Sequence, residues 1–194
     1  MKSKSKMNKL LILMGAILLI VGVFIIKPIE LNKKNNANSI TDKGMIFGDI
    51  NAPVKIYEYS DFNCPDCKKL NENIGDTLLE YINDKKVVLI FKLTNENMYL
   101  NIPKLSTEDY KELDKIFNEK DKYTNPQTEE DSKSYLGEDL YNERKNHSKE
   151  IKKEIEDLNI TVIPTLYLGT EKMVGVYKED EFKQIVENIL NSKK

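Results

Sequence analysis

Two cysteines, Cys64 and Cys67, are the residues of this 194-residue chain whose type and spacing point most directly to chemistry. They are its only cysteines and stand in the sequence CPDC, after a strand-like stretch and at the start of a helical pattern. Pro65 suits the first turn of a helix, where its missing N–H costs nothing. Unpaired backbone N–H groups and the helix dipole favour a thiolate there. The pair therefore predicts a redox-active dithiol, with Cys67 one turn on and able to close or resolve a disulfide.

Two other interpretations of the pair are a zinc site and a structural disulfide. Zinc would need about two further Cys or His ligands. The chain offers only His147, in a polar helical stretch where a solvated surface position is expected. A disulfide between residues three apart removes little entropy from the unfolded chain. The redox dithiol is favoured, with no metal and no cofactor beyond the Cys64–Cys67 disulfide.

An acidic residue precedes the cysteines within an apolar strand pattern. In VKIYEYS, the period of two places Glu58 on the same strand face as Val54 and Ile56. Burial there would raise the pKa of Glu58 and make it a proton acceptor for the second cysteine. The alternative is a hydrated position at the edge of the sheet.

A proline interrupts the apolar stretch TVIPTLYLG. Because Pro164 cannot donate to a strand ladder, its place favours a special conformation such as a cis bond at the start of a strand. A cis turn would bring backbone groups of Ile163 beside the cysteines. An ordinary trans proline on an edge strand is the alternative.

The elements that must position these residues follow from hydrophobic periodicity. Strands are expected from Val54, over about residues 86–93, and at TVIPTLYLG and KMVGVY. Helices are expected after the cysteines, through a charged insertion at about 94–159, and at the C-terminus. A strand, helix, strand order implies a right-handed parallel crossover, and the last two strands form a hairpin. The predicted class is α/β, with a mixed sheet.

The N-terminus carries four lysines followed by 17 uncharged apolar residues, Leu10 to Ile26. As a helix they would span about 25 Å, slightly less than a hydrocarbon core of about 30 Å. We expect an uncleaved signal-anchor over residues 1–27, a flexible stalk over 28–44 and a folded domain over 45–194. A cleaved signal peptide is the alternative for the N-terminal segment. The lysines predict an inside N-terminus, so the domain would lie on the extracytoplasmic side, where disulfides persist.

The charge balance argues against nucleic-acid binding. The net charge is -2, but beyond the first 29 residues 25 basic residues face 32 acidic ones. A phosphate backbone would be repelled, and no basic stripe with stacking aromatics is present.

The motifs together resemble the thioredoxin superfamily. The chain has an acid six residues before the first cysteine (Glu58), CPDC at a helix start, and IPT before a hairpin and final helix. It is similar in particular to membrane-anchored DsbA-like thiol-disulfide oxidoreductases of Gram-positive bacteria, over roughly residues 47–194. The resemblance implies a thioredoxin-like mixed sheet with helices on both faces and a helical insertion.

The resemblance also implies roles for individual residues. Cys64 would be the exposed nucleophile, Cys67 the buried resolving cysteine and Glu58 the buried acid. Substrate would be bound by the cis-proline loop and the residues between the cysteines: Ile163, Pro164, Pro65 and Asp66. The implied function is the introduction of disulfides into exported proteins with free cysteines, followed by reoxidation by an unidentified membrane or extracytoplasmic partner.

Asp66 departs from the pattern of strongly oxidising relatives, which typically have His beside the second cysteine. A carboxylate roughly 7 Å from the Cys64 sulfur disfavours the thiolate by about 0.6 to 2.4 kcal/mol, at an effective dielectric between about 80 and 20. Because an oxidising pair is one whose reduced form is stabilised, a reductase or isomerase is an alternative. A third hypothesis is a non-catalytic accessory protein for an exported peptide.

Overall fold

The computed structural model describes residues 40–106, 108–123 and 127–193. The predicted signal-anchor and the stalk up to residue 39 lie outside the described residues. Within the part of the chain that is described, no helix is long and apolar enough to span a bilayer.

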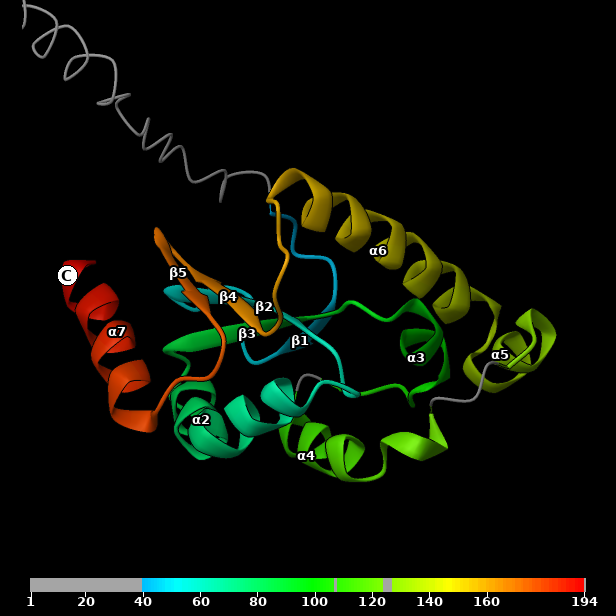
Figure 1. Ribbon diagram of the computed structural model, residues 1–194, viewed down its shortest axis with the longest axis horizontal. Coiled ribbons are helices and arrows are strands. Elements are labelled where there is room, and N and C mark those ends of the chain that lie inside the picture. The colour runs from blue at the N-terminus through cyan, green and yellow to red at the C-terminus, as the bar shows by residue number, and fades with distance from the viewer. Residues whose placement is uncertain (1–39, 107, 124–126, 194) are drawn as a thin grey trace, which may run out of the picture. The chain divides into compact units, whose positions relative to one another are not determined.

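Five strands form one mixed sheet in the order β1-β3-β2-β4-β5 (Figure 1). β2 and β3 are parallel, as the predicted crossover requires, and the other neighbouring pairs are antiparallel. The sequence did not indicate β1, because three residues are too few to establish a period of two. The strands are β1 (Met45–Phe47), β2 (Val54–Ser60), β3 (Val87–Leu93), β4 (Thr165–Leu168) and β5 (Glu171–Val174).

Helices cover both faces of the sheet, which confirms the predicted fold class. In Figure 1, α2, α4 and α7 lie on one side of the sheet and α6 on the other. The predicted insertion corresponds to the four helices between β3 and β4. The helices are α2 (Pro65–Asn83), α3 (Glu96–Asn101), α4 (Tyr110–Asn118), α5 (Glu129–Leu136), α6 (Glu138–Asp157) and α7 (Glu179–Ser192), with a 3-10 turn, η2 (Lys120–Lys122), after α4.

The sequence of α2 explains how it holds the cysteines against the sheet. Pro65 occupies its first turn, and the stripe predicted from fourfold spacing is buried along its length: Leu70, Ile74, Leu78 and Ile82. Cys67 belongs to the same buried face. Burying a large apolar side chain contributes roughly 1.5 to 3 kcal/mol, so this stripe fixes the helix to the sheet.

Arg144, the only arginine of the chain, joins two helices of the insertion. Its guanidinium is buried on α6 and donates to the carbonyl oxygens of Tyr99 (2.8 Å), Ile102 (2.6 Å) and Pro103 (2.8 Å). These carbonyls lie at the C-terminal end of α3, where helical acceptors lack intrahelical partners. His147 is also buried, with Nδ1 3.2 Å from the Tyr99 hydroxyl. The prediction of a solvated His147 is wrong, because α6 packs this face against α3.

A buried ion pair ties α6 to the sheet. Lys92 of β3 lies 2.7 Å from Glu154 of α6, and Glu154 also accepts from the Tyr59 hydroxyl at 2.7 Å. The backbone N–H of Thr41 donates to Glu154 at 2.8 Å, and Lys92 donates to the carbonyls of Thr41 (2.8 Å) and Lys43 (2.9 Å). The predicted stalk boundary at residue 44 is therefore too late. Residues 41–43 are held by the domain, because the buried ions need their backbone groups as partners.

We predict that Glu154→Gln lowers the free energy of unfolding by about 3 kcal/mol or more, since it leaves the Lys92 ammonium buried without a counter-ion. Urea denaturation would measure the change. Asp157→Asn, which removes the exposed Lys153–Asp157 pair of the same helix, should cost at most about 0.5 kcal/mol. Equal effects of the two substitutions would contradict the assignment of the buried pair.

Candidate active site

A tight turn between β2 and α2 places Cys64 at the N-cap of the helix. The backbone N–H of Asn63 donates to the Asp61 carboxylate at 2.8 Å, and that of Cys64 donates to the Asp61 carbonyl at 3.0 Å. Asp61 therefore closes the turn with its side chain and its backbone together. Cys64 has extended backbone angles, and Pro65 follows as the first helical residue, as predicted.

The Cys64 sulfur faces a distant segment of the chain. It makes no capping bond to the backbone of its own helix. Its thiol instead donates to the carbonyl oxygen of Ile163, at 3.7 Å from the sulfur. The Ile163–Pro164 bond is cis, as expected from the sequence. Two segments 99 residues apart thus meet at the reactive sulfur.

The loop that carries the cis bond is fixed at both ends. The Thr165 hydroxyl donates to the carbonyl of Val162 at 2.7 Å, and the backbone N–H of Gly175 donates to the carbonyl of Pro164 at 2.8 Å. These bonds use groups from the start of β4 and the end of β5. The backbone of Ile163 is thereby held in place beside Cys64.

The second cysteine has a different environment. Cys67 is fully buried, whereas Cys64 is partly exposed, and both are free thiols. Burial raises the pKa of the Cys67 thiol strongly, and the neighbouring Cys64 adds to the increase. The nearby Ser60 hydroxyl and Asp61 backbone N–H favour the thiolate and offset part of this increase in pKa. The pair therefore consists of an accessible sulfur and a protected one.

Glu58 lies buried on β2 and is 5% exposed, so the alternative of a hydrated edge position is wrong. Burial raises its pKa from 4.5 to about 7, and the nearby Ser60 hydroxyl reduces the increase. Lys92, the buried cation of the next strand, is paired with Glu154 and faces α6 instead. A carboxyl with a pKa near neutrality can take up or release a proton at physiological pH.

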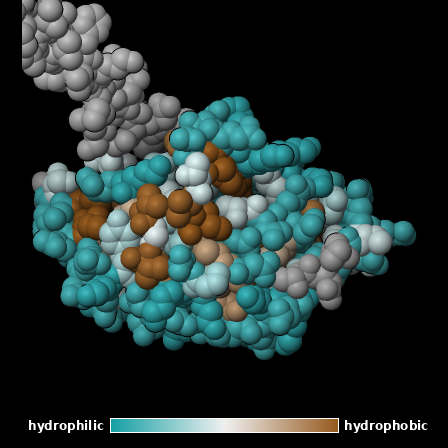
Figure 2. Space-filling model, viewed as in Figure 1, coloured by the Kyte–Doolittle hydropathy of each residue, from teal (hydrophilic) through white to brown (hydrophobic). Residues whose placement is uncertain are grey.

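The surface around Cys64 combines exposed polar and apolar side chains. Pro65 and Asp66 are both exposed in the first turn of α2. Across the cis-proline loop, Val162 is 51% exposed, Val174 45% and Val176 39%. Figure 2 shows hydrophobic side chains gathered on one face of the molecule. Substrate contacts at Pro65, Asp66, Ile163 and Pro164 remain predictions, as does the effect of Asp66 on Cys64.

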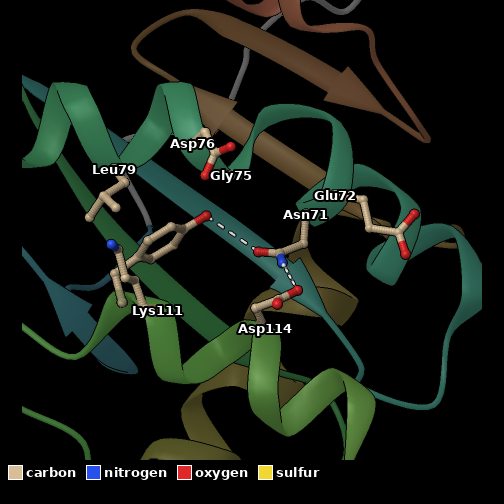
Figure 3. A pocket seen from close by; sticks show the side chains of 8 residues that line it. Asn71, Glu72, Gly75, Asp76, Leu79, Lys111 and Asp114 are labelled. Carbon is tan, nitrogen blue, oxygen red and sulfur yellow. Dashed lines mark hydrogen bonds between the residues drawn. The ribbon is translucent and has the colours of Figure 1, made fainter.

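A cavity of about 430 Å³ lies between α2 and α4. Figure 3 shows Asn71, Gly75 and Asp76 on its α2 side and Asp114 on its α4 side. The Tyr110 hydroxyl donates to Asn71 at 3.3 Å, and the Asn71 amide donates to Asp114 at 3.4 Å. Neither cysteine lines this cavity.

One residue at the site was not singled out from the sequence. Ser60 is fully buried and stands two residues after Glu58 on β2. The signal that could have identified it is the period of two itself, which places Glu58 and Ser60 on one strand face.

Comparisons with known proteins agree with this geometry. A family model described as Thioredoxin matches residues 40–188. The probable disulfide bond formation protein D of Bacillus anthracis is 34% identical over 97 residues, which are 47% of this chain and 43% of that protein. The match thus spans less than half the length of this curated relative.

Solved structures share the fold at low sequence identity. A conserved protein of unknown function from Enterococcus faecalis V583 matches with a TM-score of 0.59 and 23% identity, over 78% of this chain and 94% of its own. Alpha-DsbA1 of Wolbachia pipientis matches with a TM-score of 0.53 and 20% identity, over 76% of this chain and 90% of its own. Oxidised BdbD from Bacillus subtilis matches with a TM-score of 0.53 and 20% identity, over 75% of this chain and 92% of its own. These similarities show that the shared fold extends over about three quarters of the chain.

The asymmetry of the cysteines predicts selective alkylation. With iodoacetamide near pH 7.5, the reduced protein should react at Cys64 at least about 100-fold faster than at Cys67, because burial withholds the Cys67 thiolate. Mass spectrometry of digests would locate the label. In Cys64→Ala the remaining thiol should stay protected until urea unfolds the protein. Similar labelling rates at both sulfurs in the native state would contradict the asymmetry.

The raised pKa of Glu58 predicts a pH-dependent stability. An acid with a higher pKa in the folded state stabilises the fold below the unfolded pKa of 4.5, and this contribution is lost as pH rises through about 7. The stability of Glu58→Gln relative to the wild type should therefore increase by about 3 kcal/mol between pH 4 and pH 8. Urea denaturation of both proteins, with the cysteines kept reduced, measures this difference. A difference that does not change with pH would show that Glu58 ionises normally.

Proposed function

The chain belongs to the thioredoxin family, and on this premise we propose that it is an extracytoplasmic thiol-disulfide oxidoreductase that introduces disulfides into exported proteins. The observation that carries the proposal is the position of the accessible Cys64 sulfur, 3.7 Å from the carbonyl of Ile163 in the cis-proline loop. Cys67 is buried one turn further along the same helix. The B. anthracis relative, named as a probable disulfide bond formation protein, supports this direction of chemistry.

The reaction begins with Cys64 and Cys67 joined as a disulfide. A substrate thiolate attacks the Cys64 sulfur, so a mixed disulfide forms and the Cys67 sulfur leaves as a thiolate. This thiolate takes up a proton, for which Glu58 is the nearby buried donor. A second substrate thiolate then attacks the substrate sulfur of the mixed disulfide and releases Cys64 as a thiolate. The substrate loses two electrons and gains a disulfide, while the protein ends as a dithiol.

The surface around the cysteines suits an unfolded polypeptide. The backbone of Ile163 lies beside Cys64, where an extended substrate segment would pass. The partly exposed valines around the loop, Val162, Val174 and Val176, offer apolar contacts of low sequence selectivity. Pro65 and Asp66, both exposed, directly follow Cys64 in the chain. An oxidase of many exported proteins requires this kind of general contact.

The N-terminal sequence supports placement at the outer face of the membrane. The lysines and the apolar residues Leu10 to Ile26 would anchor the chain with its domain on the extracytoplasmic side. There the domain would meet exported proteins with free cysteines as they emerge. A membrane or extracytoplasmic redox partner would reoxidise the dithiol, and the Cys64–Cys67 disulfide would serve in place of a cofactor.

Asp66 favours a second candidate, a reductase or isomerase of the same fold. Its carboxylate is exposed in the first turn of α2, between the cysteines. A negative charge near Cys64 would destabilise the reduced thiolate form and make the disulfide a weaker oxidant. The two candidates differ in the reduction potential of the pair.

We predict a reduction potential of about -120 to -180 mV, in the range of known oxidases and isomerases. It would be measured on the full chain in detergent, equilibrated with glutathione buffers. The oxidised protein should also restore activity to a reduced, unfolded disulfide enzyme, and Cys64→Ala should abolish this. A potential near about -270 mV would favour the reductase. A pair that never equilibrates, in a protein whose cellular role survives Cys64→Ala, would favour the accessory hypothesis.

A further inference from the structure

The face of β2 that α2 covers carries a buried hydroxyl, that of Ser60. Ser60 is fully buried, and its Oγ makes no hydrogen bond of standard geometry with any described residue. A buried hydroxyl without a satisfied hydrogen bond destabilises the folded state, and alanine at this position would avoid that cost. Stability therefore does not explain why position 60 is a serine.

The backbone fixes the direction of the Ser60 side chain. Alternation along the strand places Ser60 on the same face as Glu58, two residues before it. The partners of these two residues on β3 are the apolar Leu93 and Phe91. The carbonyl of Ser60 accepts from the backbone N–H of Thr94 at 2.9 Å, which holds the end of the strand in place. The hydroxyl consequently lies between the sheet and the first turns of α2.

Two groups with raised pKa values are within reach of this hydroxyl. The nearby Ser60 hydroxyl lowers the pKa of the Cys67 thiol and also that of the Glu58 carboxyl, against the larger effect of burial. Both contacts fall short of full hydrogen-bond geometry, so the hydroxyl is near both groups without being fixed to either. A serine hydroxyl has one donor and two acceptor sites, and can therefore accept a proton on one side while donating on the other.

We propose that Ser60 is a catalytic residue that relays the proton between the Cys67 sulfur and the Glu58 carboxyl, an inference that rests on the proposed thiol-disulfide chemistry. When the protein oxidises a substrate, Cys67 leaves as a thiolate. The Ser60 hydroxyl gives its proton to that sulfur and receives one from Glu58, which ends as a carboxylate. When Cys67 instead resolves a mixed disulfide, each proton moves in the opposite direction. Protons and electrons balance in both directions without a further reactant.

The surroundings make this route specific to Ser60. From α4, the Tyr110 hydroxyl lies close enough to Glu58 for the carboxylate charge to raise the pKa of the phenol. That hydroxyl is bonded to Asn71 and remains a poor acid. The Asp61 backbone N–H also bonds to Cys67 but cannot transfer its proton. Among the described groups that act on the pKa of Cys67, Ser60 is the one that also acts on Glu58.

The test separates the two steps of exchange with oxidised glutathione. The reduced full chain in detergent is mixed with oxidised glutathione, acid-quenched and analysed by mass spectrometry. Attack by Cys64 forms the glutathione mixed disulfide. Resolution by Cys67 then forms the Cys64–Cys67 disulfide and releases glutathione as a thiolate, which takes up a proton from solvent.

In Ser60→Ala we expect attack by Cys64 to stay within about twofold of the wild type and resolution to slow by about 10 to 100-fold, up to the lower end of the range for general acid-base catalysis. Ser60→Thr keeps the hydroxyl and should restore most of the rate. The increase of the resolution rate with pH through the Glu58 ionisation should disappear in Ser60→Ala. Ser148→Ala is the matched control, because Ser148 is also a buried serine without a standard hydrogen bond but lies on α6.

Resolution at the wild-type rate in Ser60→Ala would overturn the relay, as would equal slowing in the alanine and threonine variants. Equal slowing of both steps would mean a disturbed site and would also overturn it. These outcomes are distinct from failure of the proposed function. A strongly reducing potential would reject the oxidase while leaving the ratio of the two rates measurable.

Discussion

The central constraint of this structure is that the end of β2, from Glu58 to Ser60, is buried on both faces of the sheet. The polar side chains of this stretch lose contact with water, so each ionisable one must be paired or accept a shifted pKa. Tyr59, on the α6 side, donates to Glu154, which pairs with Lys92. Glu58, on the α2 side, has no such counter-ion among the described residues, and its pKa rises to about 7. One strand thus carries a neutralised polar cluster and a titratable one.

The paired cluster stabilises the connection between the insertion and the sheet. Lys92 belongs to the sheet and Glu154 to α6, while residues 41–43 supply the remaining polar partners. Removing either charge would leave the other buried alone, so the contact holds in one arrangement only. Arg144 acts similarly within the insertion, where it satisfies carbonyl oxygens at the end of α3. The insertion is consequently an integral layer of the domain.

The raised pKa of Glu58 depends on the lack of a cationic partner for its carboxyl among the described residues. A salt bridge to Glu58 would lower its pKa and remove its capacity to exchange protons near neutral pH. Cys64 and Cys67 differ because Cys64 stands at the N-cap with an extended backbone, before the first helical residue, whereas Cys67 belongs to the buried face of α2. The outer sulfur meets the carbonyl of Ile163, and the inner one lies buried under the first turn of α2. In the proposed function, this arrangement would connect exchange at the surface with proton transfer in the core.

The sequence by itself determined the local part of this protein. The CPDC spacing, the fourfold stripe of α2, the alternation that buries Glu58 and the proline that becomes cis all follow from residues close together in the chain. Tertiary structure decided the rest: the contact of Cys64 with Ile163, the pairing of Lys92 with Glu154, the burial of His147 and the attachment of residues 41–43. These depend on which faces meet across about 50 to 110 residues. The order of elements predicted the sheet, but the partner of each buried polar group is fixed only when the layers pack.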